Sequence, residues 1–147
     1  MKEINKPSVL IFRIMLSSIF LVAAIQHLLK PEKVATRLAN AKMGFIATSF
    51  ASPEILVIIA GIGLLIGGLL LLVGFKTKLA AALLILMIVP ITLTIQVGNP
   101  EELGPLFKNI GLAGGLIFFL FNGSLYYGVD TIFINNKLNT QKHEKLN

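Results

Sequence analysis

The sequence predicts an all-α fold, a four-helix transmembrane bundle with an amphipathic interfacial helix between the first two spans. Apolar residues make up 55% of the 147-residue chain and the mean hydropathy is +0.84, above the roughly 45–50% apolar usage of soluble domains. Four stretches of 18 to 21 residues are almost entirely apolar. At 1.5 Å per residue each reaches roughly 27–31 Å, which matches the thickness of a bilayer core. The expected spans are residues 9–29, 55–75, 79–97 and 110–127.

The polar joints between these stretches support the same division. Ser52, Pro53 and Glu54 have the order of an N-cap, a first-turn proline and an acidic first turn, so they start the second span. Residues 76–78 form a short basic hairpin, and residues 98–100 end the third span. Pro90 should kink that third helix, which membrane helices tolerate. The four spans therefore form one domain, residues 1–134.

The connection between the first two spans, residues 30–52, carries an apolar repeat at helical spacing. We expect an amphipathic helix on the membrane surface, and a solvated loop is the alternative. The tail, residues 135–147, is polar and lysine-rich, which is typical of disorder. The apolar repeat consists of Val34, Leu38, Ala41 and Phe45, opposite Lys33, Arg37 and Asn40.

The basic residues predict a topology. One side of the membrane would hold eight Lys or Arg residues and the other five, which favours both termini in the cytoplasm. An alternative treats residues 1–13 and 14–22 as parts of a signal peptide that is cleaved near residues 22–24. The five are Lys30, Lys33, Arg37, Lys42 and Lys108; the eight are Lys2, Lys6, Arg13, Lys76, Lys78, Lys137, Lys142 and Lys145.

Composition argues against several functions. The net charge of +6 is scattered between apolar runs, as in membrane flanks, so we expect no nucleic-acid partner. The chain has no cysteine, which excludes disulfides and thiolate ligation within it. Its two histidines, His27 and His143, are too few for a three-ligand metal site, and no nucleophile stands beside a plausible base. We therefore predict no metal site, and catalytic residues stay unknown.

One face of the first span is polar or small. Arg13, Ser17, Phe20, Ala24 and His27 fall within about 40° of one line at 100° per residue, so this stripe should face the bundle interior. For Arg13 the alternative is snorkelling toward the headgroups.

Because successive spans alternate in direction, Arg13 at the start of the first span shares a membrane face with Asp130, which follows the fourth. We predict an ion pair between these two residues.

The opposite membrane face collects the four residues with the most chemical potential. His27 and Gln26 end the first span, Glu54 starts the second and Gln96 ends the third. An imidazole and a carboxylate beside an apolar bundle could bind a quinone carbonyl or relay a proton. The alternative is that all four are ordinary headgroup-level residues.

Glycines in the second and fourth spans follow the small-x-x-x-small pattern of close helix contacts. Gly63, Gly67 and Gly74 lie on one face of the second span, and Gly111 and Gly115 repeat the pattern in the fourth. We expect these five positions to mark helix packing.

The order of these features resembles the DoxX family of small bacterial membrane proteins. The similarity rests on Arg13 in residues 11–13, on residues 20–28 and 67–81, and on Gly123 and Asp130. The chain departs from the family where Ala24 and His27 replace glycine and lysine, and where Gly63 or Leu64 stands at the position of a carboxylate. The resemblance implies a bacterial inner-membrane protein associated with oxidoreductases, in some relatives with a quinone-linked thiosulfate-oxidising complex.

We therefore predict an accessory or quinone-associated subunit of a membrane oxidoreductase system that is not catalytic alone. Its partners would be the lipid bilayer and a membrane or soluble oxidoreductase, with a homo-oligomer as a further option. One alternative is a small four-helix transporter that acts as a dimer, although such carriers need a carboxylate inside a span. The other is a structural or assembly protein without small-molecule chemistry.

Overall fold

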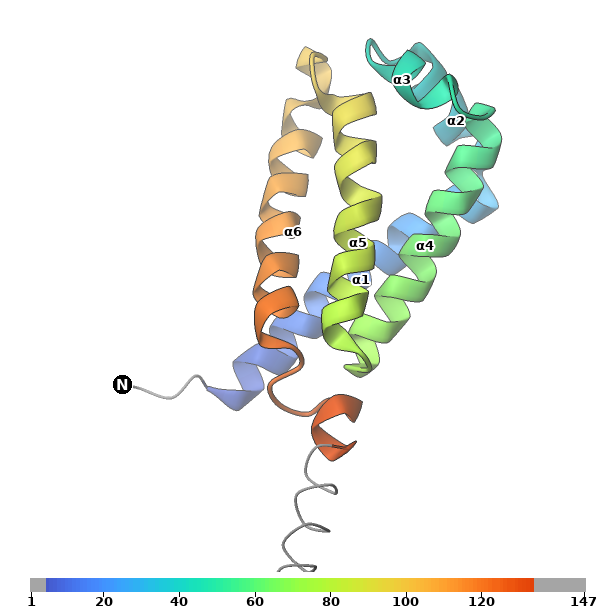
Figure 1. Ribbon diagram of the computed structural model, residues 1–147. Helices are drawn as coiled ribbons and strands as arrows, with labels where there is room; N and C mark the ends of the chain where they lie inside the picture. The colour runs from blue at the N-terminus through green and yellow to red at the C-terminus, as the bar shows by residue number, and fades with distance from the viewer. Residues whose placement is uncertain (1–4, 134–147) are drawn as a thin grey trace, which may run out of the picture.

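The computed structural model describes residues 5–133 and confirms the all-α prediction. Four helical segments are long and apolar enough to cross a membrane, and residues 5–133 contain no strand (Figure 1). They are α1 (Lys6–Leu29), α4 (Pro53–Val73), α5 (Thr77–Ile91) with the π-helix η1 (Thr92–Gln96), and α6 (Leu103–Asn122) with the 3₁₀ turn η2 (Pro100–Glu102). The short helices α2 (Pro31–Asn40) and α3 (Gly44–Thr48) join α1 to α4. The protein is an integral membrane protein. The proposed tail, residues 135–147, lies outside the described residues.

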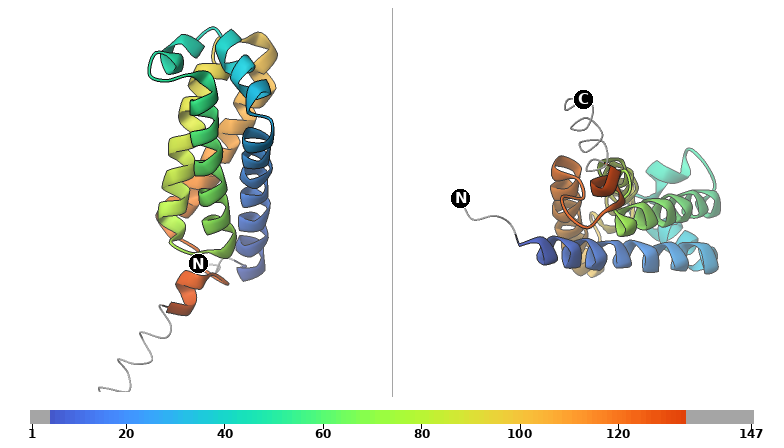
Figure 2. Two further views of the ribbon diagram at one scale, coloured as in Figure 1. Left: turned by 90° about the vertical axis from the view of Figure 1, so that its right-hand side faces the viewer. Right: turned by 90° about the horizontal axis from the view of Figure 1, so that it is seen from below.

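The helices pack in the order α1, α4, α5, α6, and α2 rests against α4 at one end (Figures 1 and 2). We call that end, where α2 and α3 lie, the His27 end, and the opposite end the Arg13 end. In Figure 1, α4 and α5 meet at the Arg13 end and diverge toward the His27 end. Residues of α4, α5 and α2 at this end line a cavity that is described below.

Leucine and phenylalanine side chains from all four spans fill the interior, and the outward faces carry exposed Ile, Leu and Phe. Leu71, Leu84, Leu116 and Phe119 are fully buried, whereas the outward-facing side chain of Leu79 is 64% exposed. Lipid offers no hydrogen-bond partners, so each spanning helix satisfies its backbone polar groups internally. The side chains that face the lipid can then be apolar, as they are here.

The predicted inward stripe of the first span is confirmed. Arg13, Ser17, Phe20 and Ala24 are all at most 2% exposed, and His27 is half-buried. Arg13 therefore points into the bundle, and the snorkelling alternative is wrong.

The fourth span differs from its predicted bounds of 110–127. The helix begins at Leu103, and Pro105 is tolerated because the first turn needs no intrahelical N–H. It ends at Asn122, since Gly123 takes a positive φ of 71°. Residues 124–128 are consequently not helical, and their backbone is free for other contacts.

The surface segment forms two helices rather than one. Ala41 adopts an extended conformation and ends α2, which breaks the helical repeat. Leu38 is buried against the bundle as the repeat predicted, but Phe45 on α3 is 65% exposed. The segment is therefore packed on the spans mainly through α2, with a smaller contribution from α3, and the solvated-loop alternative is wrong.

Only part of the glycine prediction corresponds to helix packing. A Cβ on Gly63 or Gly67 would lie 2.6 or 2.8 Å from Met87 or Leu84 of α5, and one on Gly115 would lie 2.9 Å from Phe12 of α1. Gly111 meets nothing within 4 Å among the described residues, so its packing role is not found there. Gly74 is the left-handed cap that ends α4, where φ is +68°.

Two glycines that the sequence pattern missed bring α1 against α4. A Cβ on Gly61 would lie 2.9 Å from the Cβ atom of His27, and one on Gly68 would lie 2.9 Å from Leu21. They are seven residues apart, which places them on the same helix face, so this spacing is the signal that could have identified the contact.

Candidate functional site

The Arg13 end is built around one buried guanidinium. Arg13 is 1% exposed and donates hydrogen bonds to three backbone carbonyls, those of Ser124 (3.5 Å), Tyr126 (3.3 Å) and Tyr127 (2.6 Å). Its Nε atom is buried without a hydrogen-bond partner among the described residues. The nonhelical segment 124–128 thus supplies carbonyls that a continuing helix would have used internally.

Asp130 holds the hairpin between α4 and α5 instead of pairing directly with Arg13. Its carboxylate accepts hydrogen bonds from the backbone N–H of Lys76 (2.7 Å), and from the backbone N–H and the hydroxyl of Thr77 (both 2.9 Å). It acts as an N-cap of α5 supplied from a distant part of the chain. No salt bridge between Arg13 and Asp130 is found within residues 5–133, so the predicted pair is not in direct contact there, although the charge of Asp130 still acts on the Arg13 guanidinium.

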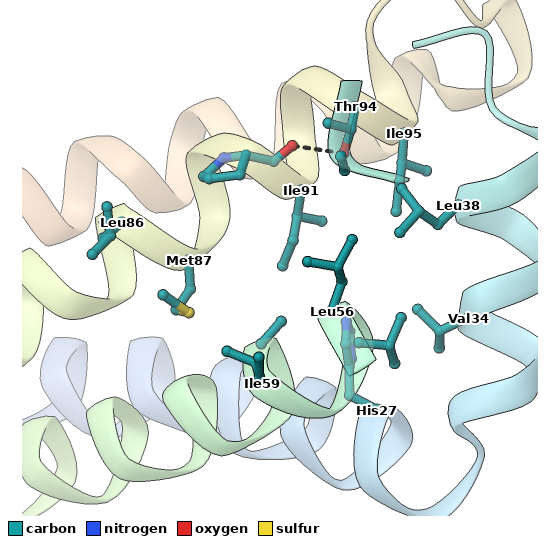
Figure 3. Close-up of a pocket in the computed structure, with 14 residues that line it drawn as sticks. His27, Val34, Leu38, Leu56, Ile59, Leu86, Met87, Ile91, Thr94 and Ile95 are labelled. Atoms are coloured by element: carbon teal, nitrogen blue, oxygen red, sulfur yellow. Dashed lines mark hydrogen bonds between the residues drawn. The ribbon is translucent and has the colours of Figure 1, made fainter. Parts of the chain in front are cut away.

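The His27 end contains an apolar cavity of about 200 Å³ between α4 and α5 (Figure 3). Side chains of α1, α2 and α3 complete its wall, so α2 covers the place where the spans diverge. Twelve of its fourteen lining residues are apolar, and His27 and Thr94 are the two polar ones. The lining comprises His27, Val34, Leu38, Ala47, Leu56, Val57, Ile59, Ala60, Leu86, Met87, Pro90, Ile91, Thr94 and Ile95.

The His27 ring has a fixed orientation in this wall. Its Nδ1 atom lies 2.8 Å from the carbonyl oxygen of Ala23 one turn earlier. Because Gly61 has no side chain, α4 can approach the Cβ atom of His27 closely, and the ring extends from α1 toward the cavity (Figure 3). No other hydrogen bond of His27 is found within residues 5–133, so Nε2 remains available to a ligand.

A second cavity of about 150 Å³ also borders His27, and we call it the polar cavity because six of its thirteen lining residues are polar or charged. Gln26, Gln96 and Asn109 contribute to its wall, as do the cations Arg37 and Lys108. Among the residues at this cavity, the Asn109 amide donates hydrogen bonds to Gln96 Oε1 (3.1 Å) and to the Thr92 hydroxyl (2.9 Å). These bonds link α6 to the end of the third span. Among the described residues, His27 is the one titratable residue that lines both cavities.

Three of the four residues predicted to form a site are brought together here. His27, Gln26 and Gln96 line the polar cavity, whereas Glu54 is exposed at the start of α4 and lines neither cavity. This geometry gives no support to the prediction that Glu54 joins the group.

The sequence analysis missed two members of the site. Asn109 lay one residue before the predicted start of the fourth span, and a correct helix start at Leu103 would have identified it as a polar residue inside a span. Arg37 was assigned only to the polar face of a surface helix, yet it lines the polar cavity and pairs with Glu102. No group of three or more His, Cys, Asp or Glu side chains suited to a metal ion occurs within residues 5–133.

Fold and site together define a small four-span helical membrane protein, closed at one end by a buried arginine and hollowed at the other beside a histidine. The chain belongs to the DoxX family, whose model matches residues 8–97. The matched region carries Arg13, His27 and every residue that lines the apolar cavity. No curated protein and no solved structure matches the chain.

Proposed function

We propose that this protein is an accessory subunit of a membrane oxidoreductase system and holds a quinone-type ring in the apolar cavity beside His27. The observation that carries the proposal is the cavity itself, about 200 Å³ of apolar space with a single imidazole in its wall. An apolar cavity of roughly 150 Å³ holds one benzene ring. The space therefore suits one substituted six-membered ring, and its isoprenoid tail would extend into lipid.

The polar contacts of the cavity fit the chemistry of such a ring. Ligand sites are mostly apolar, with a few polar groups that fix orientation, and here His27 and Thr94 are those groups. Beyond His27, the polar cavity with Gln26, Gln96 and Asn109 supplies hydrogen-bonding groups through which a proton could exchange with water. The electron-transfer step belongs in our proposal to a separate membrane or soluble oxidoreductase, as expected for this family.

Filling the cavity tests the proposal without touching a polar group. Ala60 lines the cavity on α4, whereas Ile62 on the same helix is 47% exposed on the outward face. Ala60→Phe should abolish labelling of the purified protein by a photoreactive azidoquinone, and Ile62→Phe should leave it unchanged. Equal labelling of the two variants would place the quinone elsewhere or nowhere, and the proposal would be wrong.

We further propose a bacterial inner-membrane location with both termini in the cytoplasm, which puts the His27 end on the outer side. The chain has no cysteine, so single introduced cysteines report topology cleanly. Lys42→Cys should react with a membrane-impermeant maleimide in intact cells, and Lys78→Cys should react only after the membrane is opened. The reverse pattern would invert the topology.

The two alternatives receive less support. A proton-coupled carrier needs a carboxylate in the membrane interior, and in the described spans the carboxylates lie only near helix starts, at Glu54, Glu101 and Glu102. A purely structural protein would gain nothing from the cavity. Co-purification of the solubilised protein with an oxidoreductase, detected by mass spectrometry, distinguishes the proposed subunit from both.

A further inference from the structure

The polar groups of the apolar cavity differ from an ordinary mixed set of donors and acceptors. Apart from His27 and Thr94, the lining side chains contain no oxygen or nitrogen atoms. The hydrogen-bonding character of the cavity is consequently set by these two side chains and by backbone groups that its helices leave unpaired.

His27 offers an acceptor. A carbonyl oxygen can only accept, so the 2.8 Å contact to Ala23 requires that Nδ1 carries the proton. In the neutral imidazole this leaves Nε2 with a free lone pair and no hydrogen. His27 would become a donor at Nε2 only by taking up a proton.

Thr94 also offers an acceptor. Its hydroxyl donates its one hydrogen to the Pro90 carbonyl at 2.7 Å, so only its lone pairs remain for a ligand. Pro90 has no N–H, which leaves the Leu86 carbonyl four residues earlier without its usual helical partner. Both Pro90 and Leu86 line the cavity. The two polar side chains of the cavity therefore present acceptors only.

From this arrangement we infer that the cavity binds the hydroxyl-bearing, reduced form of the ring, a quinol, in preference to the quinone; the inference rests on the proposed function. A quinol hydroxyl donates to Nε2 of His27 or to Thr94, whereas a quinone carbonyl finds no donor and loses its hydrogen bonds to water. Sites that hydrogen-bond a substrate hydroxyl reject analogues that lack it.

The test compares three probes with the same ring and tail, using the full-length protein in lipid nanodiscs under anaerobic conditions. The probes are a decyl-substituted benzoquinone, its quinol, and the dimethyl ether of that quinol, which has no hydroxyl. Equilibrium dialysis should give a dissociation constant for the quinol roughly tenfold or more below those of the other two, as expected for one unmatched hydrogen bond.

Substitutions then assign the preference to a residue. His27→Leu should weaken quinol binding roughly tenfold and leave quinone binding nearly unchanged, because only the acceptor is lost. His27→Gln should retain most of the quinol affinity, since its amide oxygen also accepts. Ser18→Leu is the matched control, because Ser18 lies on the exposed face of α1 and lines neither cavity.

The outcomes separate the two proposals. Equal affinity for all three probes, with His27→Leu affecting them alike, overturns the inference and leaves a quinone site in place. Tighter binding of the quinone than of the quinol also overturns it. If no probe binds and Ala60→Phe changes nothing, the proposed function falls together with the inference.

Discussion

The two ends of the bundle differ in how closely their chain segments are held together. At the Arg13 end, Arg13 and Asp130 each make three hydrogen bonds, and the chain is held in left-handed conformations at Lys76, Leu125 and Tyr127. At the His27 end, the helices diverge around two cavities, and the imidazole keeps one nitrogen free. Nonglycine residues adopt a positive φ only when surrounding contacts stabilise it, so the Arg13 end is the more constrained of the two. Our proposal places a ligand at the His27 end.

Removal of the buried guanidinium should cause the largest change in stability. Arg13→Leu leaves the carbonyls of residues 124, 126 and 127 without their donor, and each unsatisfied group costs about 1–3 kcal/mol. We expect a loss of about 3 kcal/mol or more in the free energy of unfolding, measured by denaturant titration in detergent. His27→Leu is the control and should change stability by less than about 1 kcal/mol. Equal losses in the two variants would contradict the division of roles.

Gly74 and Gly111 allow the effect of an added methyl group to be compared at a crowded and at an open position. A Cβ on Gly74 would lie 2.6 Å from Arg13 Nη1 and 2.8 Å from the Cα atom of Gly128, in a conformation with φ +68°. Gly74→Ala should therefore destabilise the protein by about 1–3 kcal/mol. Gly111→Ala meets open space and should be neutral or stabilise α6 by up to about 1 kcal/mol. Thermal unfolding of both variants in the same detergent gives the comparison, and a loss at Gly111 would reveal a neighbouring chain on that face.

Asp130 tests whether the Arg13 end is one unit. Asp130→Asn keeps the shape of the cap but removes its charge, and it should destabilise the start of α5 by about 1–2 kcal/mol. Because Asp130 contacts Lys76 and Thr77 rather than Arg13, exchanging the charges as Arg13→Asp with Asp130→Arg should not restore stability. Recovery in the exchanged double variant, measured by unfolding, would show a direct ion pair after all.

The smallest effect is expected from the ion pair on the cavity side. Arg37 of α2 and Glu102 of η2 form a salt bridge whose arginine side chain is 52% exposed, so solvent screens it. Arg37→Gln should cost less than about 0.5 kcal/mol of unfolding free energy, and high salt should reduce even that. A larger, salt-independent loss would mean that the His27 end is held as firmly as the Arg13 end.

The site shows where prediction from sequence stops. Helical spacing was enough to place Arg13, Ser17 and His27 on the inward stripe, because residues on one helix face keep their relation in any fold. Glu54 was grouped with His27 by a different inference, namely that both lie at the same depth in the membrane. Depth does not determine toward which side of its helix a side chain points. Asn109 was not predicted, because the fourth span was expected to begin at residue 110 and α6 begins at Leu103. Pro105 and Lys108 are more typical of a loop than of a membrane span.

What the sequence determined by itself is the solvent and the number of spans. A window of about 20 apolar residues favours insertion whatever its neighbours are, so the four spans are properties of single helices. The tertiary structure alone decided that Arg13 binds the carbonyls of residues 124, 126 and 127, that Gln96 contacts Asn109, and that a cavity separates α4 from α5 beside His27. Each of these depends on which helices meet and on loop dihedral angles, and no local pattern in the chain encodes either.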